Sequence, residues 1–85
     1  MPLPRLPVIP SRLSQVRRLA KPAITQADLQ ARLQIQGVMM DQSMLSKIEN
    51  GQRPVTDVEV VAFAKALKVS VGWLLGEADN QMPSS

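Results

Sequence analysis

The sequence predicts an all-α fold, a compact domain of five short helices. Two observations lead to this fold class. Several segments begin with the residue pattern of a helix N-terminus, and no segment shows the alternation of apolar and polar residues typical of a strand. With 85 residues, 45% of them hydrophobic, the chain has room for a single small core. The predicted helices span residues 11–20, 26–36, 42–50, 57–67 and 71–75.

The first predicted helix follows a segment rich in proline. Four of the seven prolines fall in residues 1–10, which favours an extended, flexible arm. Such an arm either follows a nucleic-acid backbone or is simply a loose terminus. Ser11 is the expected N-cap of the helix, and Pro22 follows its end. Its apolar stripe consists of Leu13, Val16 and Ala20. Arg12 and Arg18 are expected to point outward.

The later helices have readable starts and stops. Thr25 and Thr56 are expected N-caps, each followed three residues later by an acidic residue, as in a capping box. Asp41 and Ser70 are the expected caps of the remaining two helices. Glycines mark the ends of three helices: Gly37, Gly51 and Gly76. The domain therefore spans residues 11–76, followed by a polar, flexible tail over 77–85.

Composition excludes several kinds of function. The chain has no Cys and no His, which excludes thiolate sites, zinc fingers and imidazole bases, so we expect no metal, no cofactor and no enzymatic activity. No apolar run is long enough for a membrane span or a secretory signal, which favours a cytoplasmic protein. The net charge of +3 is uneven: residues 1–56 carry +5 and residues 57–85 carry −2. This asymmetry favours a polyanionic partner for one side of the molecule.

The helix predicted over 42–50 has the character of a DNA-reading helix. Only Leu45 and Ile48 are strongly apolar at core spacing, whereas its start and the following turn carry amide, hydroxyl and ammonium groups. Gln42, Ser43 and Lys47 carry the donors and acceptors that recognise base edges in a major groove. A solvated polar face would have the same composition, so the spacing alone leaves both interpretations open.

Residues 24–75 resemble the lambda-repressor/Cro-type helix-turn-helix domain, also called the xenobiotic-response-element family. The similarity lies in three stretches: ITQADL at 24–29, LSKIENGQR at 45–53 and AKALKVSVGWLL at 64–75. The resemblance implies a lambda-repressor-like DNA-binding domain of bacterial or phage origin, with double-stranded DNA as its partner. The sequence departs from the family pattern between Leu33 and Asp41, where it has an extended loop. Because of this loop, the resemblance does not predict the tilt of the next helix.

The resemblance also implies roles for individual residues. Gln42, Ser43 and Lys47 correspond to positions that read bases. Phosphate contacts are implied for Gln26, Ser46, Asn50 and Arg53. Glu49 corresponds to an acid that pairs with an arginine of the first helix, with Arg17 preferred over Arg18. Trp73 is expected in the core.

The predicted function is that of a sequence-specific regulator of transcription, most simply a repressor that binds a palindromic operator as a homodimer. The helix over 57–67 has more apolar residues than one core stripe requires, so Val58 and Ala62 are candidates for the dimer surface. The alternative is a protein-interaction module on the same fold, such as an antitoxin or an anti-repressor.

Overall fold

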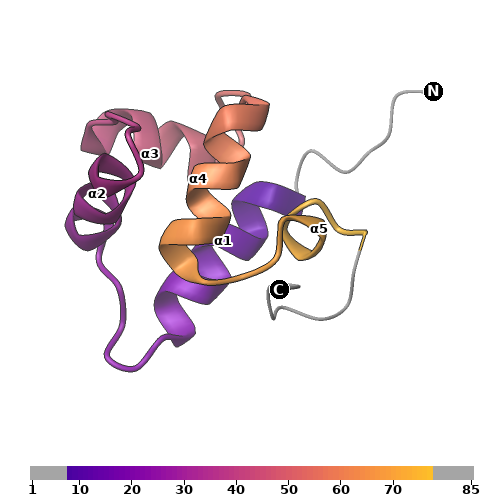
Figure 1. The fold of residues 1–85 in the computed structure, drawn as a ribbon, viewed down its shortest axis with the longest axis horizontal. Helices are drawn as coiled ribbons and strands as arrows, with labels where there is room; N and C mark the ends of the chain where they lie inside the picture. The colour runs from indigo at the N-terminus through magenta and orange to yellow at the C-terminus, as the bar shows by residue number, and fades with distance from the viewer. Residues whose placement is uncertain (1–7, 78–85) are drawn as a thin grey trace.

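The chain forms helices joined by short connections, and the computed structural model describes residues 8–77. Within that range there is no strand, as the predicted all-α class requires. The helices are α1 (Val8–Leu19), α2 (Gln26–Ile35), α3 (Gln42–Glu49), α4 (Asp57–Leu67) and α5 (Val71–Leu74), as Figure 1 shows. The predicted starts of α2 to α5 are confirmed, and their predicted ends lie within one residue of those observed. No helix in the described range is both long and apolar enough to cross a membrane.

Helix α1 begins at Val8, three residues before the predicted start, so the expected N-cap at Ser11 is wrong. Pro10 lies in the first turn, where backbone amides have no partner within the helix, and a proline is tolerated there. Residues 8–10, the last three of the arm predicted over residues 1–10, therefore belong to α1. The remainder of the arm, residues 1–7, and residues 78–85 of the predicted tail lie outside the described range.

Every helix contributes to one hydrophobic core. The largest fully buried side chains are Leu13, Leu29, Leu33, Leu45, Ile48, Phe63 and Leu74. Trp73 is only 5% exposed, which confirms its predicted place in the core. Arg12, expected to point outward, lies instead over the Trp73 ring, 4.6 Å from its centroid, and donates from Nη1 to the Trp73 carbonyl at 2.6 Å. The prediction failed because a long guanidinium side chain can cover an aromatic face while its tip remains near water.

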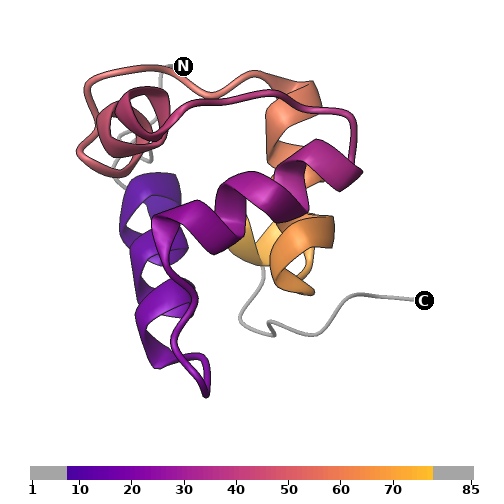
Figure 2. The same cartoon turned by 90° about the vertical axis from the view of Figure 1, so that its left-hand side faces the viewer.

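The helices are arranged so that α3 packs on α1 and α2, while α4 packs on α1, α2 and α5. In Figure 2, α2 crosses the front of the molecule and α3 lies above it, reached by a long connection. Because no other helix of the described range covers α3, its outer side faces solvent.

The predicted caps fix where α2, α3 and α4 begin. Complete capping boxes form at Thr25 and Thr56, and the Asp41 carboxylate accepts a hydrogen bond from the Met44 amide at 2.8 Å. Gly37 and Gly51 have φ values of 83° and 74°, as expected of glycines that follow a last helical turn. The cap at the end of α4 was not predicted, because the left-handed residue there is Lys68, with φ 60°.

One of the two residues expected at a dimer surface is buried. Ala62 is 4% exposed and belongs to the core, so it offers almost none of its side chain to the dimer surface for which it was a candidate. It faces inward because α4 packs against three helices and needs a wide apolar face. Val58, the other candidate, is 67% exposed.

Candidate nucleic-acid interface

Helix α3 is held by a few buried side chains and presents a polar outer face. Leu45 and Ile48 are fully buried, as predicted from their spacing. Ser43 and Lys47 lie one turn apart on the exposed side, with Gln42 beside them at the first helical position. The three residues expected to read bases are thus all exposed on α3, with Gln42 and Ser43 in its first turn and Lys47 in its last.

Gln26 connects the start of α2 to α3 through both atoms of its amide. Its Oε1 accepts from Nε2 of Gln42 at 3.1 Å, and its Nε2 donates to Oε1 of Glu49 at 3.2 Å. The Ser46 hydroxyl lies within hydrogen-bond distance of both amide atoms, at 3.3 and 3.4 Å. Two of the four residues implied as phosphate contacts, Gln26 and Ser46, therefore also fix the position of α3 against α2.

The predicted ion pair between Arg17 and Glu49 is present. Nε and Nη2 of Arg17 donate to the two carboxylate oxygens of Glu49 at 2.9 and 3.0 Å. A third nitrogen, Nη1, donates to the Ile24 carbonyl at 3.1 Å. The Arg17 and Glu49 side chains are 17% and 6% exposed, so the pair is largely shielded from solvent. Arg18, the alternative partner, instead donates to the Ser14 carbonyl in its own helix. Arg17 thus joins α1, the connection before α2, and α3.

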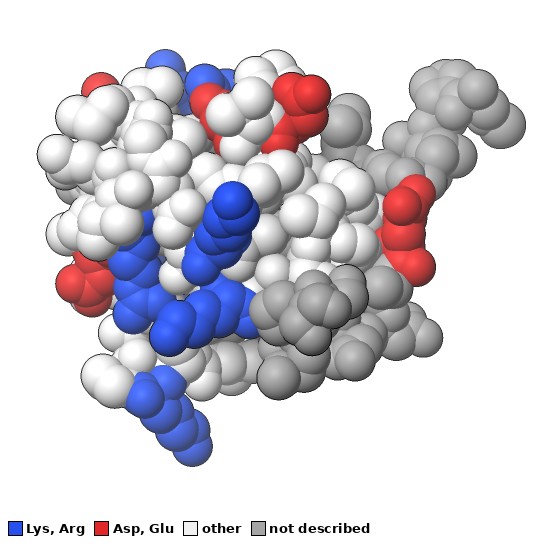
Figure 3. All heavy atoms as spheres, in the orientation of Figure 1, with Lys and Arg blue, Asp and Glu red and all other residues white. Residues whose placement is uncertain are grey.

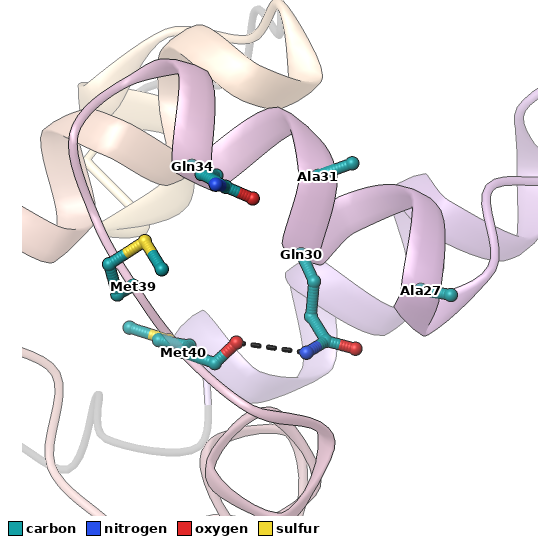
Figure 4. Close-up of a pocket in the computed structure, with 6 residues that line it drawn as sticks. All are labelled: Ala27, Gln30, Ala31, Gln34, Met39 and Met40. Carbon is teal, nitrogen blue, oxygen red and sulfur yellow. Dashed lines mark hydrogen bonds between the residues drawn. The ribbon is translucent and has the colours of Figure 1, made fainter.

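The extended loop between α2 and α3 has a defined path. The Val38 amide donates to the Leu33 carbonyl at 2.9 Å, and the Gln30 side chain donates to the Met40 carbonyl at 2.9 Å. Met40 is buried and Met39 is 72% exposed. Figure 4 shows both methionines across from α2, where they and α2 side chains border an open pocket of about 320 Å³. These anchors fix the path by which the chain enters α3.

Arg53, expected at the sugar-phosphate backbone, is bound within the protein. Its Nη1 and Nη2 donate to the Glu59 carboxylate at 3.1 and 2.9 Å. This contact raises the pKa of Arg53 and lowers the pKa of Glu59. The Glu59 carboxylate also accepts from the Thr56 amide at 3.0 Å, so one acid closes the capping box and holds Arg53. Nothing in the spacing of Arg53 and Glu59 indicates this pair, because a loop and a helix start separate them.

The remaining candidate contact lies beyond the reading helix. Asn50 is exposed and is the C-cap residue of α3, followed by the turn at Gly51. It lies one turn beyond Lys47 along the exposed side of α3. Sequence reasoning missed Gln30 as an anchor of the loop, since an amide that binds a backbone carbonyl leaves no pattern in the sequence.

The site offers hydrogen-bond donors and acceptors, together with one exposed ammonium group, on a rigid surface. In the described range no three His, Cys, Asp or Glu side chains lie close enough together to hold a metal ion. The pKa of Asp28 is lowered by its hydrogen bonds with the Thr25 backbone and side chain, so the carboxylate that caps α2 stays ionised.

Comparison with known proteins identifies the fold and its role. Residues 13–74 match the family model described as helix-turn-helix. No curated protein and no solved structure shows a significant match to the chain. The family match runs from the second turn of α1 to the end of α5 and includes α3 with the residues that hold it in place. The chain therefore belongs to the lambda-repressor/Cro-type helix-turn-helix family and is a DNA-binding regulator of transcription.

Proposed function

We propose that the protein is a sequence-specific repressor that binds a palindromic operator as a homodimer, in the cytoplasm of a bacterial or phage-infected cell. The observation that carries this proposal is the exposed group formed by Gln42, Ser43 and Lys47 on α3. Placed in a major groove, the Gln42 amide suits adenine, the Lys47 ammonium suits guanine, and the Ser43 hydroxyl suits either.

The supporting network sets the register of the reading helix on DNA. Gln26 stands at the N-terminus of α2, where backbone amides and the helix dipole favour a phosphate. Because its amide also binds Gln42, a phosphate contact at Gln26 would orient the residue that reads the base. Ser46 and Asn50 border the same surface. In a dimer the two reading helices would lie roughly 34 Å apart, one turn of DNA.

The test begins with selection of bound sites from random duplexes, followed by gel-shift titration against the selected site and a scrambled one. Gln42→Ala combined with Lys47→Ala should abolish the preference for the selected site and leave weak binding to both. The matched control is Lys21→Ala with Gln15→Ala, which changes the same residue types at exposed positions of α1 and of the connection after it, outside α3. A double variant at Gln42 and Lys47 that still discriminates would contradict the proposal.

Two variants test whether Arg53 contacts a phosphate or has only a structural role. Arg53→Ala should lower the salt dependence of binding by about one unit if the guanidinium contacts a phosphate while paired with Glu59. Glu59→Gln breaks the ion pair and keeps Arg53, so it should leave that slope unchanged. An absence of DNA affinity at low salt in the native protein would instead support the protein-interaction alternative.

A further inference from the structure

The outward face of α4 carries apolar residues that the core does not use. Val58 is 67% exposed and Val61 is 42% exposed, and they lie one turn apart on the same side of the helix. Both valines line a shallow depression of about 260 Å³, together with Gln36, Val38, Ala62 and Lys65. A solvent-facing apolar stripe next to a depression is typical of a contact surface.

The charges along the same face are separated by sign. The first turn of α4 contains Asp57 and Glu59, and its last turn contains Lys65. Figure 3 shows this arrangement: acidic side chains lie near the upper end of α4, and basic ones gather toward its lower end. Asp57 and Lys65 are both exposed, whereas Glu59 is half-buried and holds Arg53. The face therefore has one acidic end, an apolar middle and one basic end.

Such a face is complementary to a copy of itself turned end for end. Asp57 and Lys65 lie four residues before and four after Val61, about 6 Å along the helix in each direction. In an antiparallel pair of α4 helices related by a two-fold axis near Val61, Asp57 of each copy lies level with Lys65 of the other. The lysine side chain is long enough to cover the lateral offset, and its methylene groups would cover the other copy's Val58.

We propose that two copies of this chain associate through antiparallel α4 helices centred on Val61, with two Asp57–Lys65 pairs across the interface. An isologous contact of this kind uses the same patch on both subunits, as a closed dimer requires. The inference deepens the dimer in the proposed function and rests on it. The patch on each copy consists of Asp57, Val58, Val61 and Lys65.

The size of the patch limits the expected affinity of the dimer. Stable interfaces bury about 1,600 Å² in total, more than one face of an eleven-residue helix provides. The dimer is therefore weak and exchanges rapidly when unbound. Two half-sites on one operator would raise the effective concentration of one copy near the other and so favour the contact on DNA.

Charge reversal tests the register without DNA. Asp57→Lys makes both ends of the patch basic, and Lys65→Asp makes both ends acidic, so each variant alone should dimerise at least about tenfold more weakly by sedimentation equilibrium. An equimolar mixture of the two variants should regain the association, because opposite charges then meet at both pairs. The double variant within one chain should regain it as well. Circular dichroism checks that each variant is folded.

Arg18→Glu is the matched control, since it also reverses an exposed basic residue in the last turn of a helix, but on α1. It should dimerise as the native chain does. A native chain that stays monomeric, single reversals that dimerise normally, or a mixture that does not regain association would each overturn the inference. Binding to a duplex with one half-site, measured in parallel, reports on DNA recognition itself and shows whether that part of the proposed function holds independently.

Discussion

Arg17 donates two hydrogen bonds to the Glu49 carboxylate, Nε to Oε2 at 2.9 Å and Nη2 to Oε1 at 3.0 Å, and thereby holds the end of α3 against α1. The two residues are 32 positions apart in the chain. The same carboxylate accepts from Gln26 at the start of α2, so one acid coordinates three helices. The orientation of α3 thus depends on a small set of directional contacts as well as on its buried leucine and isoleucine.

Removing Arg17 should leave the shielded Glu49 carboxylate without its cation. We expect Arg17→Met to lower the free energy of unfolding by about 3 kcal/mol, because a buried charge that loses its partner retains its desolvation cost. Urea unfolding at neutral pH measures this change. Arg17→Met combined with Glu49→Leu should recover most of the loss, since neither charge then remains. Equal destabilisation in the single and double variants would contradict the pairing.

Replacing Gln26 by alanine should reduce DNA affinity and stability less than replacing it by glutamate. Gln26→Glu places a second carboxylate beside Glu49, whose Oε1 is 3.2 Å from Nε2 of the native side chain, and also opposes a phosphate at the start of α2. We expect DNA affinity to fall at least about tenfold relative to Gln26→Ala, and stability to fall further by about 1 kcal/mol. Fluorescence anisotropy and urea unfolding on both variants give the comparison. Similar affinities for the two variants would refute the phosphate contact.

Stability should decline in acid partly through Glu59. The hydrogen bonds from Arg53 hold the pKa of Glu59 below its ordinary value of 4.5, with the Thr56 backbone adding to the effect. A carboxyl with a lowered pKa in the folded state stabilises the fold above its unfolded pKa, and this contribution is lost as the pH falls through the folded value. Glu59→Gln should therefore reduce the loss of stability between about pH 5 and pH 2.

Unfolding of native and Glu59→Gln proteins across this pH range provides the measurement. Asp28→Asn serves as a comparison, since the Asp28 pKa is also lowered, in its case by hydrogen bonds with Thr25. Its curve should flatten in the same direction. An unchanged acid profile for Glu59→Gln would show that the ion pair with Arg53 does not stabilise the fold.

Replacing Lys68 by glycine should stabilise the fold. Its φ of 60° places a residue with a Cβ in the left-handed region, where glycine has no steric cost. Lys68→Gly should raise the free energy of unfolding by about 1 kcal/mol. Gly37→Ala is the converse change, at φ 83° with open space around the added methyl, and it should cost a similar amount. Thermal unfolding of the two variants should show shifts of opposite sign.

Local signals in the sequence predicted most of the fold. The four N-caps predicted for α2 to α5 are confirmed: Thr25, Asp41, Thr56 and Ser70. They could be predicted because a cap acts over three or four contiguous residues. The start of α1 was misplaced because Pro10 was read as part of an arm, although a first helical turn accepts proline.

The candidate site was predicted less completely. The pairing of Arg17 with Glu49 followed from the family resemblance and was confirmed, whereas the pairing of Arg53 with Glu59 was not foreseen. Ala62 was assigned to the surface because helical periodicity cannot tell how many neighbours a helix has. Contacts between distant side chains depend on how helices pack, and single-sequence patterns do not encode that arrangement directly.

Because few side chains of α3 are buried, its exposed residues can change without much effect on the stability of the fold. Leu45 and Ile48 hold the helix from one side, so the residues at Ser43 and Lys47 can be exchanged without repacking the interior. Gln42 is the exception, because its amide is tied to Gln26. If α3 reads DNA as we propose, a new DNA preference requires few substitutions, and a library confined to the outward positions of this short helix is a suitable starting point for retargeting the protein.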